Sequence, residues 1–85
     1  MKKTLLATAL ILSPIAALAL PAVGDVVGTN PNDVSAALAA TGCTVSDFEA
    51  EHGKVEAVCT DEAKMVWEVV IDPASGAVTE VKEKD

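Results

Sequence analysis

Residues 65–81 read MVWEVVIDPASGAVTEV, and this stretch decides the fold of the chain. Its first half alternates with the period of two residues that is typical of a β-strand. The residues on the apolar face of this strand are Trp67, Val69 and Ile71. Turn chemistry follows: Asp72 can hydrogen-bond the backbone ahead of it, Pro73 presets φ for the first turn position, and Gly76 adopts a positive φ at little cost. The stretch therefore predicts a β-hairpin with a turn built by Asp72, Pro73 and Gly76.

The register of this last hairpin has two alternatives. A four-residue loop pairs Asp72 with Ala77 and turns Glu80 toward the buried face. A bulge instead turns Thr79 and Val81 toward that face. The residues alone do not choose between the two.

Two more strands are predicted upstream, over residues 43–51 and 55–60, with a turn at residues 51–54. If Thr60 pairs with Lys64, the second of these strands and the strand after it present one continuous apolar face. The residues on that face are Val55, Ala57, Cys59, Met65, Trp67 and Val69. This agreement predicts an antiparallel meander with one apolar side.

A helix is predicted over residues 30–42. Asn30 is a good N-cap, Pro31 suits the first helical position, and Gly42 ends the helix. The helix has a narrow apolar stripe that consists of Val34, Ala37, Leu38 and Thr41. A helix this short must pack against another element. The fold class is therefore α+β, with one N-terminal helix packed on a four-stranded antiparallel β-meander.

Residues 1–19 have the parts of a secretory signal peptide. Two lysines form its positive start, an apolar stretch covers residues 5–12, and a small-x-small cleavage site ends at Ala19. A transmembrane anchor is disfavoured because the stretch is short and Pro14 interrupts it. We expect cleavage after Ala19 and a periplasmic or secreted protein that does not stay attached to the membrane.

The charge of the chain is strongly negative, with 6 basic and 13 acidic residues and a net charge of −7. Cleavage of the signal peptide removes two lysines and no acidic residue, which leaves a net charge of −9. A domain with this charge is not suited to nucleic acid or to an anionic membrane surface. The effect expected from this charge is solubility, and it does not by itself imply a cationic partner or a metal ion.

The two cysteines, Cys43 and Cys59, are expected to form a disulfide. An exported chain reaches a compartment where disulfides form, and a small domain with a thin core gains from one. Catalysis by a thiol or a metal pair is disfavoured, because no histidine is placed to activate either cysteine and no C-x-x-C motif occurs.

The order of these features resembles a PepSY domain, the small module found in peptidase propeptides and in many exported bacterial proteins. The residues that carry the resemblance are AATG at 39–42, HGK at 52–54 and WEVVIDPASGAVTEV at 67–81. The closest similarity is to the short stand-alone form, and it covers about residues 30–82. We therefore expect a flexible leader over residues 20–29 and a single PepSY-like domain over residues 30–85. The resemblance implies a module that binds peptidases and has no catalytic residues.

The side chains that could carry chemistry favour the same conclusion. His52 is the only histidine, and in a turn it is expected to be exposed instead of ligating a metal. No serine lies in a Gly-x-Ser-x-Gly elbow, and Trp67 is expected in the core instead of on a binding surface. We therefore expect no enzymatic activity, no cofactor and no metal site.

A meander leaves two edge strands, here residues 43–51 and 77–82, and an edge can accept a strand from a partner. In the first of them, the three-residue spacing of Val45 and Phe48 indicates a bulge or an imperfect edge. The acidic residues expected at the partner edges are Asp47, Glu49 and Glu80.

The function expected from the sequence is that of an exported, non-enzymatic binding module, a regulator or inhibitor of peptidases of the cell envelope. Its partner is an unknown protein or peptide of the envelope, and the module itself is expected to be a monomer. The alternative is an acidic periplasmic protein that binds metal ions or other cations, as the net charge and His52 suggest.

Overall fold

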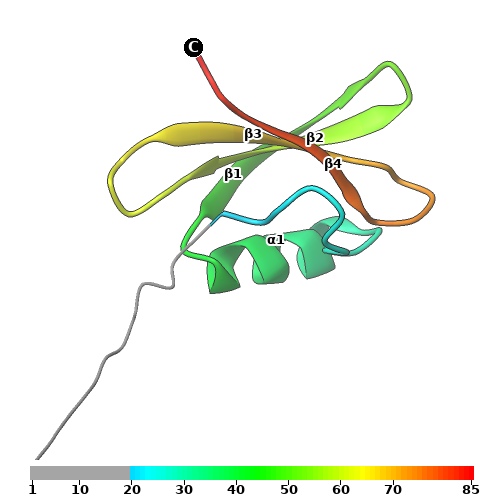
Figure 1. Ribbon diagram of the computed structural model, residues 1–85, viewed down its shortest axis with the longest axis horizontal. Coiled ribbons are helices and arrows are strands. Elements are labelled where there is room, and N and C mark those ends of the chain that lie inside the picture. Colours follow the sequence, from blue (N-terminus) through cyan, green and yellow to red (C-terminus); the bar gives the residue numbers. More distant parts are fainter. Residues whose placement is uncertain (1–19) are drawn as a thin grey trace, which may run out of the picture.

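The computed structural model describes residues 20–85, so the expected signal peptide and its cleavage site lie outside the described residues. The described part contains one helix and one four-stranded antiparallel sheet, and its class is therefore α+β. The elements in chain order are α1 (Pro31–Ala40), β1 (Thr44–Glu51), β2 (Lys54–Thr60), β3 (Val66–Ile71) and β4 (Val78–Glu83). Strands that follow one another in sequence are neighbours in the sheet, and α1 lies against one face (Figure 1). We call that face the covered face and the opposite one the open face.

Helix α1 precedes the strands but is not N-terminal, because it begins only at Pro31, after the segment of residues 20–30. The N-cap is Asn30, whose side chain accepts a hydrogen bond from the backbone N–H of Asp33 at 2.9 Å. The helix ends before Gly42, whose φ of 91° is the left-handed conformation that glycine adopts easily. In residues 20–85, no helix is long and apolar enough to cross a membrane.

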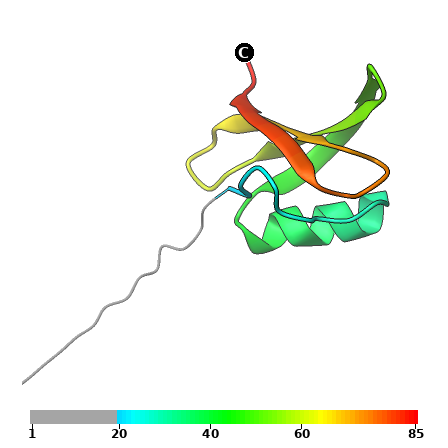
Figure 2. The ribbon, with the colours of Figure 1, turned by 45° about the vertical axis from the view of Figure 1, so that its right-hand side comes forward.

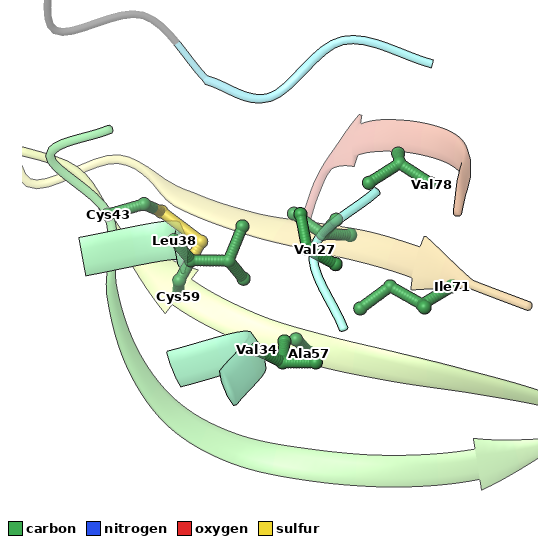
Figure 3. Close-up of a cluster of buried hydrophobic side chains, with 9 residues drawn as sticks. Val27, Val34, Leu38, Cys43, Ala57, Cys59, Ile71 and Val78 are labelled. Carbon is green, nitrogen blue, oxygen red and sulfur yellow. A yellow bond between two sulfur atoms is a disulfide. The ribbon is translucent and has the colours of Figure 1, made fainter. Parts of the chain in front are cut away.

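The hydrophobic core lies between α1 and the covered face of the sheet (Figure 3). Its buried residues are Val27, Val34, Leu38, Cys43, Ala57, Cys59, Val69, Ile71 and Val78. Of the predicted helix stripe, Val34 and Leu38 are buried, whereas Ala37 is half-buried and packs at the margin of this core. The disulfide between Cys43 and Cys59 joins the end of α1 to β2 inside the core.

The pairing of β2 with β3 corrects the expected register. Thr60 lies opposite Val66 and not opposite Lys64, so the register is shifted by two residues. The cause is a longer connection, in which the Asp61 carboxylate accepts the backbone N–H of Ala63 and of Met65, each at 2.9 Å. A shift of two residues keeps every side chain on its expected face. It does, however, move Met65 out of the sheet, where its exposure is 36%.

The hairpin of β3 and β4 combines features of both alternatives. The backbone N–H of Asp72 donates to the carbonyl of Ala77 at 2.9 Å, as a four-residue loop requires. A register shift then follows, because Ile71 lies opposite Val78 whereas Val70 lies opposite Glu80. The extra residue turns Val78 and Val81 toward the core, so Glu80 stays on the open face. Thr79, which the bulge alternative placed inside, is exposed.

The segment of residues 20–29 runs along the start of β4, where Figure 2 shows it in cyan between α1 and the β3–β4 hairpin. Gly24 donates its N–H to the carbonyl of Val78, and Val78 donates to the carbonyl of Asp25, both at 2.8 Å. Val27 donates to the carbonyl of Gly76 at 2.8 Å, and its side chain is buried in the core. The segment expected to be a flexible leader is thus hydrogen-bonded to β4 in the structure.

Strands β1 and β2 are joined by a two-residue turn. His52 and Gly53 both have positive φ, 52° and 76°, as the tightest hairpin turns require. Glu51 and Lys54 lie opposite each other at its base. Farther along, the register of β1 shifts between Val45 and Asp47, which is the bulge that the three-residue spacing of apolar residues indicated.

Candidate binding edge

The two edges of the sheet differ in how far they are covered. The outer side of β4 is paired at its start, because the segment of residues 24–28 bonds to Val78 and Gly76. The outer side of β1 has no strand beside it in residues 20–85, since β1 pairs only with β2. Strand β1 is therefore the less covered edge of the part that the structure describes.

The backbone groups that β1 directs outward follow from its turn. Glu51 closes a two-residue hairpin, so its N–H and C=O point toward β2. Directions alternate along a strand, so Ala50 and Phe48 direct theirs away from the sheet. The N–H of Phe48 is occupied by a side chain, because the Asp47 carboxylate accepts it at 2.9 Å. Between the turn and the bulge, the edge therefore offers Phe48 and Ala50 to a partner strand, and the N–H of Phe48 is capped by Asp47.

The charges beside this edge are mostly negative. Asp47, Glu49 and Glu51 lie on the open face of β1, and all three are exposed. In residues 20–85, no lysine forms an ion pair with any of them. Glu51 lies 3.9 Å from the side chain of His52, stands opposite Lys54 in the register and hydrogen-bonds to Glu56.

The β4 side of the open face is electrically different. Lys82 lies 3.8 Å from Glu68 and 4.0 Å from Glu80, and Lys84 lies 3.1 Å from Glu68. The hydrogen bond to Glu68 and the attraction of that carboxylate raise the pKa of Lys84 above its ordinary value, and the more weakly felt charges of Glu49 and Glu56 act in the same direction. Glu80, expected at a partner edge, is thus paired with a lysine and lies on the opposite edge from Asp47 and Glu49. The three residues do not come together.

Glu56 is a residue that the sequence analysis did not single out. It lies on the open face of β2 opposite Glu49, and only 8% of it is exposed. Burial raises the pKa of its carboxyl, as do a hydrogen bond with Glu51 and repulsion from Glu51 and Glu68, while Lys82 lowers it. The signal that could have found it is the cross-strand register, which places one glutamate directly opposite another.

An apolar cavity of about 100 Å³ lies on the covered side, between the start of α1 and the sheet. It is lined by Gly28, Thr29, Asn30, Pro31, Val34, Phe48, Val55, Ile71 and Pro73. Phe48 is the wall that belongs to the edge strand β1, and its side chain is only half-buried. The cavity therefore adjoins the uncovered edge.

The remaining residues singled out from the sequence have structural positions. Asp72, Pro73 and Gly76 lie in the β3–β4 turn, where Asp72 accepts the N–H of Ala74 at 2.8 Å. Gly76 has a φ of 76°, and a side chain there would meet the carbonyl oxygen of Gly28 at 2.8 Å. The turn thus needs glycine for its conformation and for the close approach of the preceding segment.

Trp67 lies on the covered face at the margin of the core, half-buried, as expected for a packing residue. Its ring N–H donates to the Asp61 carboxylate at 2.9 Å. This bond and the N–H groups of Met65 and Ala63 hold the pKa of Asp61 below its ordinary value, although partial burial opposes them. Asp61 therefore organises the β2–β3 connection and is not free for chemistry.

His52 projects into solvent, with 89% of its side chain exposed. Within residues 20–85, no three histidine, cysteine or acidic side chains come together in a way that could hold a metal ion. Both cysteine sulfur atoms of the described part are joined in the disulfide. What the arrangement offers is a strand edge, an apolar cavity and carboxylates that form no ion pair with a lysine of the described residues.

These features define a class of protein, a small α+β module whose most accessible feature is a backbone edge. Comparison with known families identifies the class further. The chain matches the model of the peptidase propeptide and YPEB domain over residues 3–82 and belongs to this PepSY family. The resemblance stated from the sequence is confirmed, and the match extends it toward the N-terminus. No curated protein and no solved structure matched the chain. Domains of this family are modules of the propeptide or inhibitor type.

Proposed function

We propose that this protein is an exported, non-enzymatic binding module that regulates or inhibits a peptidase of the cell envelope. It acts by accepting an extended segment of the peptidase as an additional strand at the edge of β1. Family membership supports a peptidase as the partner. The small core and an apolar cavity of only about 100 Å³ beside the edge suit binding better than the conversion of a substrate.

The observation that carries the proposal is the difference between the two edges. Strand β4 is shielded at its start by residues 24–28, whereas β1 directs the backbone groups of Phe48 and Ala50 into open space. Edge strands with unpaired backbone groups accept partner strands, and several peptide-binding domains work in this way. The same feature explains how a protein could bind without a deep pocket.

Export is part of the proposal and has two supports. The sequence of residues 1–19 has the composition of a signal peptide. The Cys43–Cys59 disulfide, fully buried in the core, is typical of proteins in oxidising compartments such as the periplasm. The intact mass of the exported protein checks this: a species that starts at Leu20 is expected, and one that retains residues 1–19 contradicts it.

The test of the binding mode uses two proline variants of oxidised residues 20–85. Ala50→Pro removes an outward N–H of β1, so no bond of the sheet is lost and the fold is expected to persist. Glu83→Pro is the matched control in β4, where the N–H of Lys84 points inward to Val66 and that of Glu83 therefore points outward. Circular dichroism checks the fold of both variants.

The measurement is peptidase activity in an envelope fraction of the source organism, with a fluorogenic peptide as substrate. We expect the wild-type domain and Glu83→Pro to inhibit hydrolysis and Ala50→Pro to lose the inhibition. The domain alone should not hydrolyse the substrate. Equal inhibition by both variants would contradict the use of β1, and absence of inhibition by the wild-type domain would contradict the proposed function.

A further inference from the structure

We propose that the β1 edge selects a partner strand in which basic and apolar side chains alternate. The inference rests on the proposed function, because it names the chemistry of the segment that the edge accepts. It combines three features that lie beside one another: the outward backbone groups of β1, the apolar cavity behind Phe48 and the carboxylates of the open face.

The backbone sets which side chains of a partner face which side of the sheet. A partner strand must bond to Phe48 and Ala50, the residues of β1 that direct N–H and C=O outward. Residues directly opposite each other in a sheet place their side chains on the same face. The partner residues opposite Phe48 and Ala50 therefore point to the covered side, and those between them point to the open side.

On the covered side, the partner meets the apolar cavity. Phe48 forms the wall at the edge, and Val34 and Val55 form walls deeper in the fold. The volume of about 100 Å³ suits one branched aliphatic side chain. An apolar cavity of about 150 Å³ accommodates benzene, so a tryptophan side chain is too large for this one. The partner residue opposite Phe48 is therefore leucine, isoleucine or valine.

On the open side, the partner meets negative charge. Asp47, Glu49 and Glu51 alternate along β1 and form no ion pair with a lysine in the part that the structure describes, although Lys54 lies opposite Glu51. Directly opposite charges of unlike sign stabilise a strand pair, and like charges destabilise it. A lysine or arginine of the partner would also attract the Asp47 carboxylate, which must leave the N–H of Phe48 before a new strand can pair there.

The same charges argue against a second copy of this chain as the occupant. Two β1 strands side by side would bring three carboxylates of each copy against those of the other. A self-paired dimer is therefore disfavoured at this edge. Sedimentation of oxidised residues 20–85 should show a monomer, and a dimer abolished by Ala50→Pro would contradict the inference.

The direct test uses blocked synthetic peptides with one apolar residue, KTKLKTK, and its variants KTKAKTK and ETELETE. Binding to oxidised residues 20–85 is measured by calorimetry, and the site by backbone amide NMR. We expect KTKLKTK to bind with amide shifts centred on Phe48 and Ala50. Because loss of a methylene from an apolar pocket costs about tenfold or more in selectivity, KTKAKTK should bind at least about tenfold more weakly. ETELETE should not bind, and the affinity for KTKLKTK should fall as salt increases.

Two near-isosteric variants of the domain test whether the leucine of the peptide binds in the cavity. Val55→Thr places a hydroxyl in its wall, whereas Val66→Thr makes the same change on the open face of β3, away from the cavity. Both positions are half-buried in strands, so the cost to the fold should be similar. We expect Val55→Thr to reduce the preference for leucine over alanine several-fold and Val66→Thr to leave it unchanged.

The outcomes separate this inference from the proposed function. Equal binding of KTKLKTK and KTKAKTK, or binding of none of the peptides, overturns the inference. If Ala50→Pro nevertheless abolishes peptidase inhibition, the proposed function remains. If both proline variants still inhibit the peptidase, the use of the β1 edge is overturned, whatever the peptides do.

Discussion

The two faces of the sheet bury side chains in different ways. On the covered face, Ala57, Cys59 and Val69 have no exposed surface, because α1 forms a second layer over them. On the open face, Val58 and Val70 are each only 7% exposed, although no helix of the described residues lies over them. Without a second layer of described residues over them, their cover must come from side chains on neighbouring positions of the sheet itself. One face is thus buried by a layer and the other by its own neighbours.

The two faces of the sheet also differ in the charged groups that they contain. The covered face has no ionised group among its buried residues, whereas the open face contains Glu56 at 8% exposure. On the β4 side of the open face, Lys82 and Lys84 pair with Glu68, whereas Lys54 lies opposite Glu51 without an ion pair. The β1 side of that face keeps unpaired carboxylates. On the open face, carboxylates without a lysine ion pair therefore lie beside β1, the edge that we propose for binding.

The largest expected effect is on the covered face, which contains the disulfide. Replacing both cysteines (Cys43→Ala with Cys59→Ala) opens a loop with a sequence separation of 16 residues. Such a loop contributes about 3 kcal/mol to the free energy of unfolding in the chain-entropy model. Urea unfolding at neutral pH measures the loss. The open-face counterpart is Glu68→Gln, which removes two ion pairs and should cost less, because exposed pairs contribute little.

Reduction of the wild-type domain provides the control for this prediction. Dithiothreitol should lower the stability of the wild-type domain and leave the double variant unchanged. A double variant as stable as the oxidised wild type, or one less affected than Glu68→Gln, would contradict the idea that the covered face depends on the bond.

Two adjacent valines of β3 test the comparison most directly. Val69 has no exposed surface on the covered face, and Val70 is 7% exposed on the open face. Truncation to alanine removes two carbons from each, with a transfer free energy of about 1.6 kcal/mol. Behind Val69 the truncation also leaves an enclosed cavity, which adds on the order of 1 kcal/mol. We expect Val69→Ala to cost about 2.5 kcal/mol and Val70→Ala about 1.6 kcal/mol in urea unfolding.

The change in strand propensity is the same in both variants. The difference between their losses in free energy of unfolding therefore measures the effect of α1 as a second layer. Equal losses would mean that neighbouring side chains enclose Val70 as fully as α1 encloses Val69. A larger loss at Val70 would reverse the comparison between the faces.

The elements were predictable from sequence because local chemistry specifies them. Asn30 and Gly42 mark the ends of α1, and the alternation in β2 and β3 assigns each side chain to its face. A shift of two residues leaves the alternation unchanged. The face of each side chain was therefore predicted correctly, although Thr60 pairs with Val66. The predicted length of the β2–β3 connection was wrong, because that length depends on the hydrogen bonds of the Asp61 carboxylate, which the periodicity of the sequence does not indicate.

The candidate site was predictable only in part. Acidic residues on the edge strands were visible in the sequence, but the difference between the edges was not. That difference depends on residues 24–28, whose backbone bonds to β4 have no signature in side-chain pattern. The cavity behind Phe48 likewise needs α1, three strands, the β3–β4 turn and the segment before α1 to meet, which is a property of the packed fold.

The smallest expected effect is a gain in stability on the open face. Glu56 has a pKa raised above its ordinary value of 4.5, first because of burial and then because of the hydrogen bond with Glu51 and the repulsion of Glu51 and Glu68. The Glu56 carboxyl therefore binds its proton more tightly in the folded state than in the unfolded state. As the pH rises from about 4.5 through the folded pKa, the carboxyl ionises in an unfavourable setting and the domain loses stability.

Glu56→Gln keeps the shape of the side chain and removes the ionisation. At a pH below 4.5, where the glutamate is protonated in both states, the variant and the wild type should be equally stable. At neutral pH the variant should be the more stable, although Lys82 offsets part of the gain because it attracts the ionised form. The measurement is urea unfolding at several pH values across this window. Glu49→Gln is the matched control, since Glu49 lies directly opposite on the same face but is exposed. A Glu56→Gln variant that is less stable than the wild type at neutral pH would mean that this buried carboxylate has a favourable partner, and the open face would then resemble the covered one in having every buried group satisfied.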